Sequence, residues 1–340
     1  MSDDGNMDEN PQPGSDERSV VKFDERRGPS GSFDLVSGAI WCVLGVIAGS
    51  YVSLIGAAMM AYGVVLLVRG KTFKSWAIAV AACVIPLVVM GAFTGFDTMG
   101  EQCVECLAGL VVAWLVSRER VSVTNESLVI AAITVAYLVV DVFVPMLSGQ
   151  DVVAIMASSI DTICEQYVAA GSVTQAQLPV LKEVMNLIWP FAYFALALFS
   201  VLVAHLGARL AANRVSGKQW TPFTLATFDV PTWGVAVLIV ALVVCAVSFV
   251  TTSWNQLLLM IGVNLILDVR PLFALQGVAV VVWWLASKRV GCFGRTLVLF
   301  LAIDLELSFM VMSVVGLVDF WANFRHLPRG AKTGSGTTAE

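Results

Sequence analysis

The sequence predicts an all-α protein, a polytopic bundle of about nine transmembrane helices, with eight and ten as the bounds. Of its 340 residues, 58% are hydrophobic and only 13% are charged, whereas a soluble domain has about 25% charged residues. The mean hydropathy of +0.83 agrees, because so large an apolar excess needs lipid as its outer solvent. Long apolar segments form these spans, and helices satisfy their own backbone groups within lipid.

The first 33 residues form a polar segment ahead of the helices. They hold eight acidic residues against four basic ones and are rich in glycine, proline and serine. Such a composition cannot bury enough apolar area to offset the entropy of ordering, so we expect 1–33 to be a disordered cytoplasmic tail. The charges that remain are almost balanced, and nothing in them indicates a nucleic-acid surface.

Apolar segments of about 20 residues identify the spans. The uncharged run 35–68 is too long for one span, and Gly49-Ser50 divides it into two short helices. The segment 102–117 is shorter but ends at a basic stretch, so we expect it to span as well. Five further spans are secure, and they cover residues 75–96, 127–147, 185–207, 233–251 and 296–318.

The region 254–287 is harder to interpret. Two charges and a proline divide it into apolar pieces of about 15 residues each, and these are Asp268, Arg270 and Pro271. We expect the second piece, 272–287, to span the membrane. The first piece either spans or dips into the outer side under a cover of protein.

The segments outside the spans complete a single transmembrane domain, residues 34–326. The apolar spacing within 148–184 predicts an amphipathic helix that lies on the outer surface, as a lid or a connector. Residues 327–340 are expected to form a flexible C-terminal tail.

Lysine and arginine residues set the orientation, because positively charged loops stay on the cytoplasmic side. We expect the bacterial cytoplasmic membrane, with the N-terminus inside. Nine spans would leave Arg325, Arg329 and Lys332 outside, and a tenth would misplace the last inside group, so the parity stays open. The groups counted as inside are Arg69, Lys71 and Lys74; Arg118 and Arg120; Arg209, Arg214 and Lys218; and Lys288, Arg289 and Arg295.

Glycine pairs spaced four residues apart occur in two of the apolar segments. They are Gly45 with Gly49 and Gly91 with Gly95. Such pairs let helices approach closely in lipid. We expect them to serve packing within the bundle, while homo-oligomerisation stays open.

Polar side chains inside the spans are the candidate functional residues. An ionisable group at the bilayer centre costs roughly 2.5 to 3.5 kcal/mol on insertion scales, so it is expected to face a cavity or a partner. We therefore expect a substrate or ion pathway lined by Asp141, Asn264, Arg270, Gln276, Asp304 and Glu306.

Asp304 and Glu306 lie two residues apart and point about 200° from each other around a helix. One of them should face the bundle interior and pair with Asn264, Gln276 or Arg270. Because Leu301, Ser308 and Met312 continue the stripe of Asp304, we expect Asp304 to be the interior residue. Glu306 would then meet a second helix or a partner protein.

Metal binding and catalysis find little support. Cys103 and Cys106 form a CxxC at the outer end of a span, a spacing that can bind zinc or exchange disulfides. A tetrahedral site needs about four ligands, and the two histidines lie on other segments, so we expect no metal and no cofactor. No base stands near a serine or cysteine nucleophile, and only Asp141 and Asp304 are candidates for an intramembrane aspartyl pair.

The C-terminal run Gly316-Leu317-Val318-Asp319-Phe320-Trp321-Ala322-Asn323-Phe324-Arg325 resembles the closing signature of the YybS-like family of bacterial membrane proteins. The Arg69-Gly70-Lys71 that follows the paired short helices and the stretch 264–277 with Gln276-Gly277 also match. The sequence departs from the pattern at Ala322-Asn323, where an acidic or aromatic pair is commoner. This family is distantly similar to the S components of energy-coupling-factor vitamin transporters, which implies an outward-facing small-molecule site and a separate ATPase complex as partner.

These observations favour a substrate-binding or permease-like membrane subunit for a small solute. The alternative from another class is a membrane scaffold or regulatory protein with no transported ligand, whose acidic tail would be a docking segment. An intramembrane enzyme is the third hypothesis. Ligand-dependent stabilisation separates the first hypothesis from the second, since only a solute-binding protein gains stability from its solute.

Overall fold

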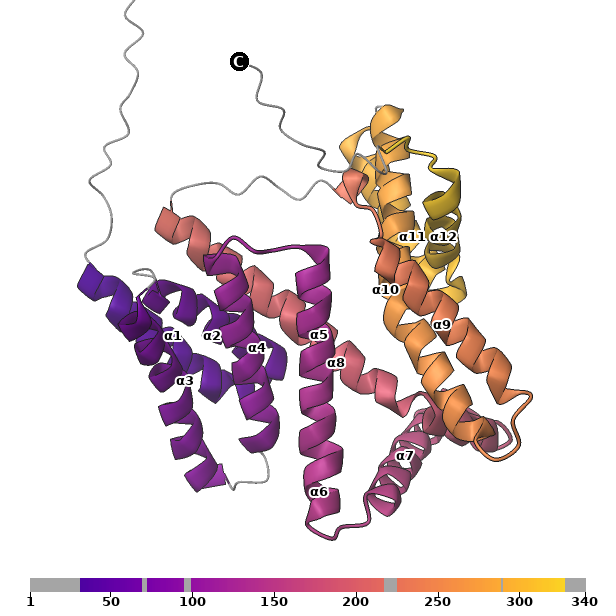
Figure 1. Ribbon diagram of the computed structural model, residues 1–340, viewed down its shortest axis with the longest axis horizontal. Helices are drawn as coiled ribbons and strands as arrows, with labels where there is room; N and C mark the ends of the chain where they lie inside the picture. Colours follow the sequence, from indigo (N-terminus) through magenta and orange to yellow (C-terminus); the bar gives the residue numbers. More distant parts are fainter. Residues whose placement is uncertain (1–30, 69–71, 95–98, 217–224, 289, 328–340) are drawn as a thin grey trace, which may run out of the picture.

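The computed structural model describes residues 31–68, 72–94, 99–216, 225–288 and 290–327. Every regular element in these residues is a helix (Figure 1). Most of the acidic N-terminal tail and of the C-terminal tail lies outside the described residues. The all-α prediction is therefore confirmed for the part of the chain that the structure describes.

The first half of the chain forms short and medium-length helices. An 18-residue helix, α7, follows them. A π-helical turn, η3, separates α5 from the short α6. The bounds are α1 Gly31–Gly49, α2 Ser53–Leu67, α3 Phe73–Thr94, α4 Met99–Ser117, α5 Val123–Leu138, η3 Val139–Phe143, α6 Val144–Leu147 and α7 Val152–Ala169.

The second half contains the two longest helices, α8 and α10, and ends in a bent pair, α11 and α12. A single 3-10 turn, η4, precedes α9. The bounds are α8 Leu178–Ser216, η4 Leu225–Thr227, α9 Thr232–Ser248, α10 Asn255–Ser287, α11 Cys292–Phe309 and α12 Val311–Ala322.

The count of nine spans is not confirmed. Five helices of the described residues are long and apolar enough to cross a membrane, and the bent pair α11 and α12 would make six if it counts as one span. Three more apolar helical stretches, Asp34–Gly49 of α1, α2 and α9, are shorter than the 18 residues taken as the minimum for a span. The five are α3, α4, the stretch from α5 through α6, α8 and α10.

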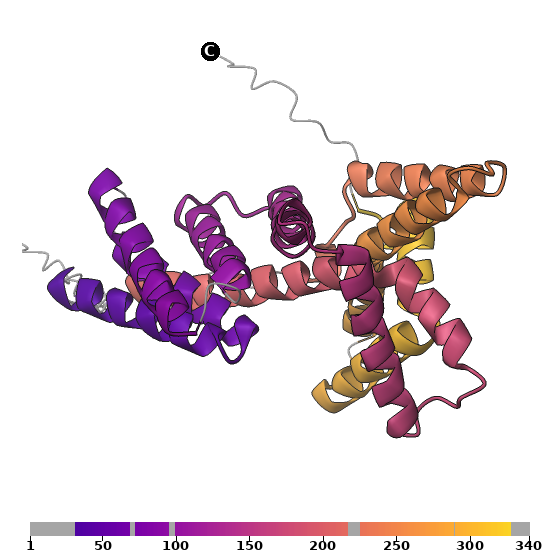
Figure 2. The same cartoon turned by 90° about the horizontal axis from the view of Figure 1, so that it is seen from below.

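Two hydrophobic cores organise the helices. The larger core joins α1 to α5 with the C-terminal part of α8, and the smaller one joins α9, α10 and α12. Figures 1 and 2 show α8 running from one group of helices to the other. The molecule therefore has two helical halves, with α8 as the long element between them.

Glycines bring α1 and α2 into close contact. A Cβ built at Gly56 would lie 2.9 Å from the backbone nitrogen of Gly49, and one built at Gly45 would lie 2.8 Å from that of Met60. No side chain fits between these backbones. The prediction that Gly45 and Gly49 serve internal packing is confirmed, whereas Gly95 of the second pair lies outside the described residues.

The division of residues 254–287 into two pieces was wrong. They form the single helix α10 from Asn255, and Pro271 lies inside it. The charge of Arg270 does not break the helix because its side chain pairs with Glu306 on α11. A polar contact with another helix thus allows a continuous helix where the sequence suggested a loop.

The expectation of one unbroken spanning helix over 296–318 was also wrong. The chain breaks at Met310, which has φ 58° and ψ 26°, and the axes of α11 and α12 differ by 100°. Other bounds shift less. The helix predicted at 185–207 is the 39-residue α8, whose first seven residues belong to the segment predicted as the outer helix, and α7 occupies the middle of that segment.

The bent pair turns back along α10. Near the end of α11, Glu306 contacts Arg270 in the middle of α10. Beyond the break, Phe324 shares an apolar hollow with Trp283 and Trp284 near the C-terminal end of α10. Helix α11 therefore runs from the C-terminal end of α10 toward its middle, and α12 runs back toward the C-terminal end. Lys288 and Arg325 thus lie at the same end of α10.

Candidate functional site: polar contacts along α10

Helix α10 carries the polar side chains that the sequence singled out in this region. Asn264, Arg270 and Gln276 lie on it, and each contacts a different neighbouring segment. Asp268 lies between them; one of its carboxylate oxygens is buried and has no hydrogen-bond partner among the described residues. Helix α10 thus makes polar contacts with several segments of the second half of the molecule.

Arg270 and Glu306 form an ion pair at the break between α11 and α12. Nε of Arg270 donates to Oε1 of Glu306 at 2.9 Å, and Nη2 donates to the backbone oxygen of Glu306 at 2.9 Å. The side chains are 24% and 13% exposed. The pair is therefore largely removed from solvent, and both charges are compensated.

The carboxylate of Glu306 also sits at the N-terminus of α12. The backbone N–H and the hydroxyl of Ser313 both donate to it, at 2.8 and 2.7 Å. An anion is favoured there, because the first N–H groups of a helix have no partner within the helix and carry the positive end of its dipole. Glu306 thus fills an anion site built from Arg270 and the first turn of α12.

Asp304 occupies a different position from the one we predicted. It is exposed on α11, whereas Glu306 makes the interior contacts. The choice of Asp304 as the interior residue was therefore wrong. It assumed one continuous helix through 296–318, and the break at Met310 instead turns the face of Glu306 toward α10 and α12.

Asn264 on α10 bonds to the backbone of α8 near Pro190. Pro190 lies inside this helix and has no backbone N–H to donate, and the side-chain amide of Asn264 contacts the backbone on either side of it. The Phe191 N–H donates to Oδ1 of Asn264 at 2.8 Å, and Nδ2 donates to the Leu187 carbonyl at 2.8 Å. In a regular helix these two backbone groups would bond to each other. Nδ2 also donates to the Met260 carbonyl of its own helix, so Asn264 fastens α10 to α8.

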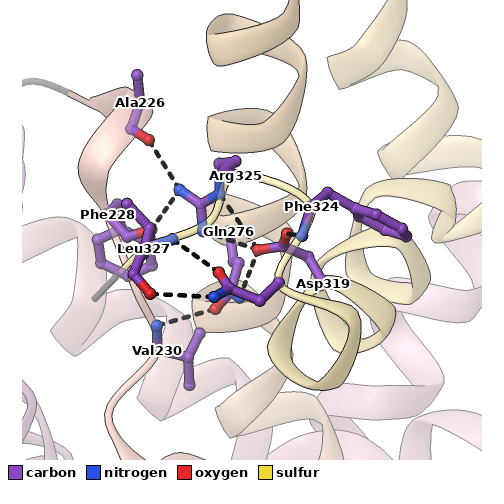
Figure 3. A network of polar contacts seen from close by, with 9 residues as sticks. Ala226, Phe228, Val230, Gln276, Asp319, Phe324, Arg325 and Leu327 are labelled. Carbon is purple, nitrogen blue, oxygen red and sulfur yellow. Dashed lines mark hydrogen bonds and ion pairs between the residues drawn. The ribbon is translucent and has the colours of Figure 1, made fainter. Parts of the chain in front are cut away.

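Gln276 belongs to a buried network around the chain end, shown in Figure 3. Its Nε2 donates to Oδ2 of Asp319 at 2.9 Å. Arg325 donates to the same oxygen from Nε and Nη2, at 3.2 and 2.8 Å, and the Phe324 N–H donates to Oδ1. Neither the Asp319 nor the Arg325 side chain is exposed to solvent.

The same network satisfies the irregular backbone before α9. Nη1 of Arg325 donates to the carbonyls of Ala226 and Phe228, at 2.9 and 2.7 Å, and the Val230 N–H donates to Oε1 of Gln276 at 2.8 Å (Figure 3). Irregular backbone buried in a membrane protein needs such partners, since each unpaired group is costly. The network therefore joins α12 and the residues directly after it to the segment that leads into α9.

Sequence reasoning missed Asp319 and Arg325 as interior charges. Asp319 stood one residue beyond the predicted span, so the criterion of an ionisable group at membrane depth did not select it. The signal was present in the C-terminal signature, where both residues occur. Asn323 in that signature has φ 46° and closes α12 in the left-handed conformation that asparagine tolerates.

Asp141 lies apart from these contacts. It stands on the π-helical turn η3 in the other half of the molecule and interacts with Tyr193 of α8. A π-helical turn inside a helix is rare and is frequently found at functional sites. The structure therefore divides the predicted pathway residues between two places.

The two cysteines of the CxxC point into different surroundings. Cys103 is exposed, whereas Cys106 is buried and interacts with Cys83 of α3. Within the described residues, no group of three or more histidine, cysteine, aspartate or glutamate side chains is arranged to hold a metal ion.

The family of the chain follows from its sequence over most of its length. A family model described as "Predicted membrane protein (DUF2232)" matches residues 39–320. The chain belongs to the DUF2232 family. No curated protein and no solved structure matches it.

Membership in the DUF2232 family agrees with the apolar helices and establishes a membrane protein. The match runs from within α1 to within α12, so it includes Arg270, Glu306 and Asp319. The YybS-like name and the similarity to S components of energy-coupling-factor transporters stay expectations from the sequence. The DUF2232 description names neither a substrate nor a partner.

Proposed function

We propose that the chain is a substrate-binding or permease-like membrane subunit for a small anionic solute. The observation that supports this is the anion site at the break between α11 and α12, where Arg270 and Ser313 hold the carboxylate of Glu306. A small carboxylate or phosphate offers the same acceptor oxygens. Such a solute would displace Glu306 from Arg270 and take its place.

The position of this site supports the proposal. Broken helices whose N-termini point at anionic groups form the substrate sites of many transporters, near the middle of the membrane. Here the break lies beside Arg270, halfway along α10. An Arg–Glu pair that opens when solute arrives keeps both charges compensated in the empty protein, where an unpaired Arg270 would be costly.

The proposal includes a membrane location and a partner. The chain resides in the bacterial cytoplasmic membrane with its N-terminus inside, because the predicted inside loops carry most of the lysine and arginine. The chain is not an enzyme, and a separate ATPase complex supplies the energy for uptake. This part rests on the sequence alone.

One observation favours the scaffold alternative. Helix α11 exposes apolar side chains and Asp304, and Ala302 is its buried residue. A carboxylate among apolar side chains in lipid is costly unless a partner meets it. A membrane protein that docks on this face would give the chain a role without any solute.

Ligand-dependent stabilisation tests the proposal. We would measure thermal unfolding of the purified protein in detergent with a panel of small carboxylates and inorganic phosphate. A true ligand at a hundred times its Kd stabilises by about 2.7 kcal/mol. Arg270→Gln should abolish this stabilisation, whereas Arg295→Gln at the exposed start of α11 should keep it. If no anion stabilises the wild-type protein, the solute proposal fails and the scaffold role takes its place.

A further inference from the structure

A second group of acidic side chains lies in the other half of the molecule. Glu101 and Glu105 stand at the start of α4, and Asp141 stands on η3. The two segments are in contact, because a Cβ built at Gly100 would overlap the Val140 side chain. Three carboxylates from two segments of the chain thus lie close together where α4 begins.

Three further helices close around this acidic group. Nε2 of Gln102 donates to the Ser50 hydroxyl at 2.7 Å, which ties α4 to the turn between α1 and α2. A Cβ built at Gly49 would lie 3.1 Å from Oε2 of Glu105, so the carboxylate rests against that turn. Tyr193 on α8 interacts with Asp141. The group therefore lies inside the larger helical half rather than on a loop.

Three buried polar atoms in and beside this acidic group have no hydrogen-bond partner among the described residues. Glu105 is 3% exposed, and Tyr137 and Ser200 are 0% exposed. Oε2 of Glu105 and both hydroxyl oxygens make no hydrogen bond to any described residue. Tyr137 lies beside Ser200 and within electrostatic range of Glu101, Glu105 and Asp141. Buried polar atoms normally have partners, so each of these three calls for an explanation.

No cation among the described residues compensates the charge. The groups that interact with Glu105 and Asp141 are serine, tyrosine and glutamate side chains, with no lysine, arginine or histidine among them. An isolated buried carboxylate is far too costly to persist, and such a group becomes neutral instead. Glu105 therefore requires either a bound cation or a proton.

The surroundings favour the proton. The carboxylates are not arranged to share one metal ion. Hollows of about 440 and 310 Å³ open elsewhere, beside Trp284 and beside Trp233. A proton needs no cavity, and chains of aspartate and glutamate carry protons in membrane pumps and transporters.

We propose that Glu105 is the inner proton-binding group of a relay that opens at Glu101. The resting protein holds Glu105 as a neutral acid. When the proton leaves, it passes to the Asp141 carboxylate through the hydroxyl of Tyr137, which makes no hydrogen bond in the resting protein and must turn toward the two carboxylates, giving up one proton as it accepts another. Glu105 is then the anion and Asp141 the neutral acid. Asp141 passes the proton to the neighbouring Glu101 carboxylate, and Glu101, which is exposed, releases it to water.

This relay goes beyond the proposed solute site and does not depend on it. The Arg270–Glu306 pair lies in the smaller half, and the two sites share no residue. Loss of anion stabilisation would leave the relay untouched, and loss of the relay would leave anion binding untouched. Each proposal can therefore fail alone.

Infrared spectroscopy tests the relay, because a protonated carboxylic acid has its own carbonyl stretching band. We would record pH-difference spectra of the full chain in phosphatidylcholine vesicles. The wild type should show this band at neutral pH and lose it as the pH rises. Glu105→Gln should lose the part of the band that Glu105 contributes, whereas Glu165→Gln, which changes an exposed residue of α7, should keep the full band. Identical spectra for wild type and Glu105→Gln would overturn the proposal.

One further variant and one comparison of salts complete the experiment. Tyr137→Phe removes the hydroxyl alone and should shift the band, even if Glu105→Gln fails to fold; an unshifted band would contradict the relay. Sodium chloride, compared with choline chloride at constant pH, distinguishes a proton from a metal ion. Loss of the wild-type band with sodium alone would mean that a metal ion occupies the site, and the proton proposal would be wrong.

Discussion

Asp319 and Arg325, six residues apart, form an ion pair in which neither side chain is exposed to solvent. The carboxylate accepts from Gln276, Phe324 and Arg325, and the guanidinium also reaches two carbonyls before α9. Such complete pairing is what allows two charges to remain buried.

Removal of one partner should therefore be severe. We expect Arg325→Ala to lower the free energy of unfolding by about 3 to 5 kcal/mol, because it leaves the buried Asp319 carboxylate with fewer donors. Arg325→Lys should also destabilise, since an ammonium cannot reproduce the forked contacts. Denaturant-induced unfolding in detergent would measure both. Arg295→Ala, at an exposed arginine, is the control and should change little; an equal loss in that variant would contradict the assignment.

The pair at the helix break should matter more than the neighbouring aspartate. Glu306→Gln weakens charged hydrogen bonds to Arg270 and Ser313, and we expect it to lose about 1.5 to 3 kcal/mol of stability. Asp304→Asn, on the exposed face, should stay within about 0.5 kcal/mol. A double-mutant cycle with Arg270→Gln isolates the coupling. Coupling near zero would show that the ion pair is not the stabilising contact.

Met310 stores backbone strain that a glycine would relieve. A left-handed conformation costs an L residue about 1 to 2 kcal/mol, and Met310 adopts it at φ 58°. We expect Met310→Gly to raise the free energy of unfolding by about 1 kcal/mol. Met310→Ala keeps the strain and should not raise it. If glycine lowers stability instead, packing of the methionine side chain outweighs the strain.

Topology labelling tests the return of the chain at Met310. In a cysteine-free background, Ser287→Cys at the end of α10 and a tag after Glu340 should be reached from the same side of the membrane. Ser253→Cys, in the exposed turn before α10, should be reached from the opposite side. Ser287 and the tag on opposite sides would mean that α11 and α12 cross the bilayer together as one span.

Hydropathy predicted the helical class and the positions of several helices. The spans expected at 75–96, 102–117 and 233–251 lie close to α3, α4 and α9, because unbroken apolar runs leave no other satisfied conformation in lipid. The paired short helices within 35–68 were also predicted correctly, since Gly49-Ser50 marks the turn.

The polar contacts could not be predicted in the same way. Neither a glycine nor a proline stands at Met310, so local sequence gives no sign of the break there. The contact that accompanies the break comes from Arg270, which lies 36 residues before Glu306. Equally, the charges of Asp268 and Arg270 suggest a loop when only the sequence is read, and the contact of Arg270 with Glu306 on α11 appears only in the structure. Tertiary contacts, rather than local preference, decided these positions.

The contact between Asn264 and α8 has a mechanical consequence. At Pro190 the long helix lacks its own continuous bonding, and an amide from α10 completes it. Release of that one side chain would free the Leu187 carbonyl and the Phe191 N–H together and leave α8 to pivot there. Tyr193, which interacts with Asp141, lies three residues beyond Pro190. Movement at this pivot would change the distance between the acidic group and the helix break without unfolding either half.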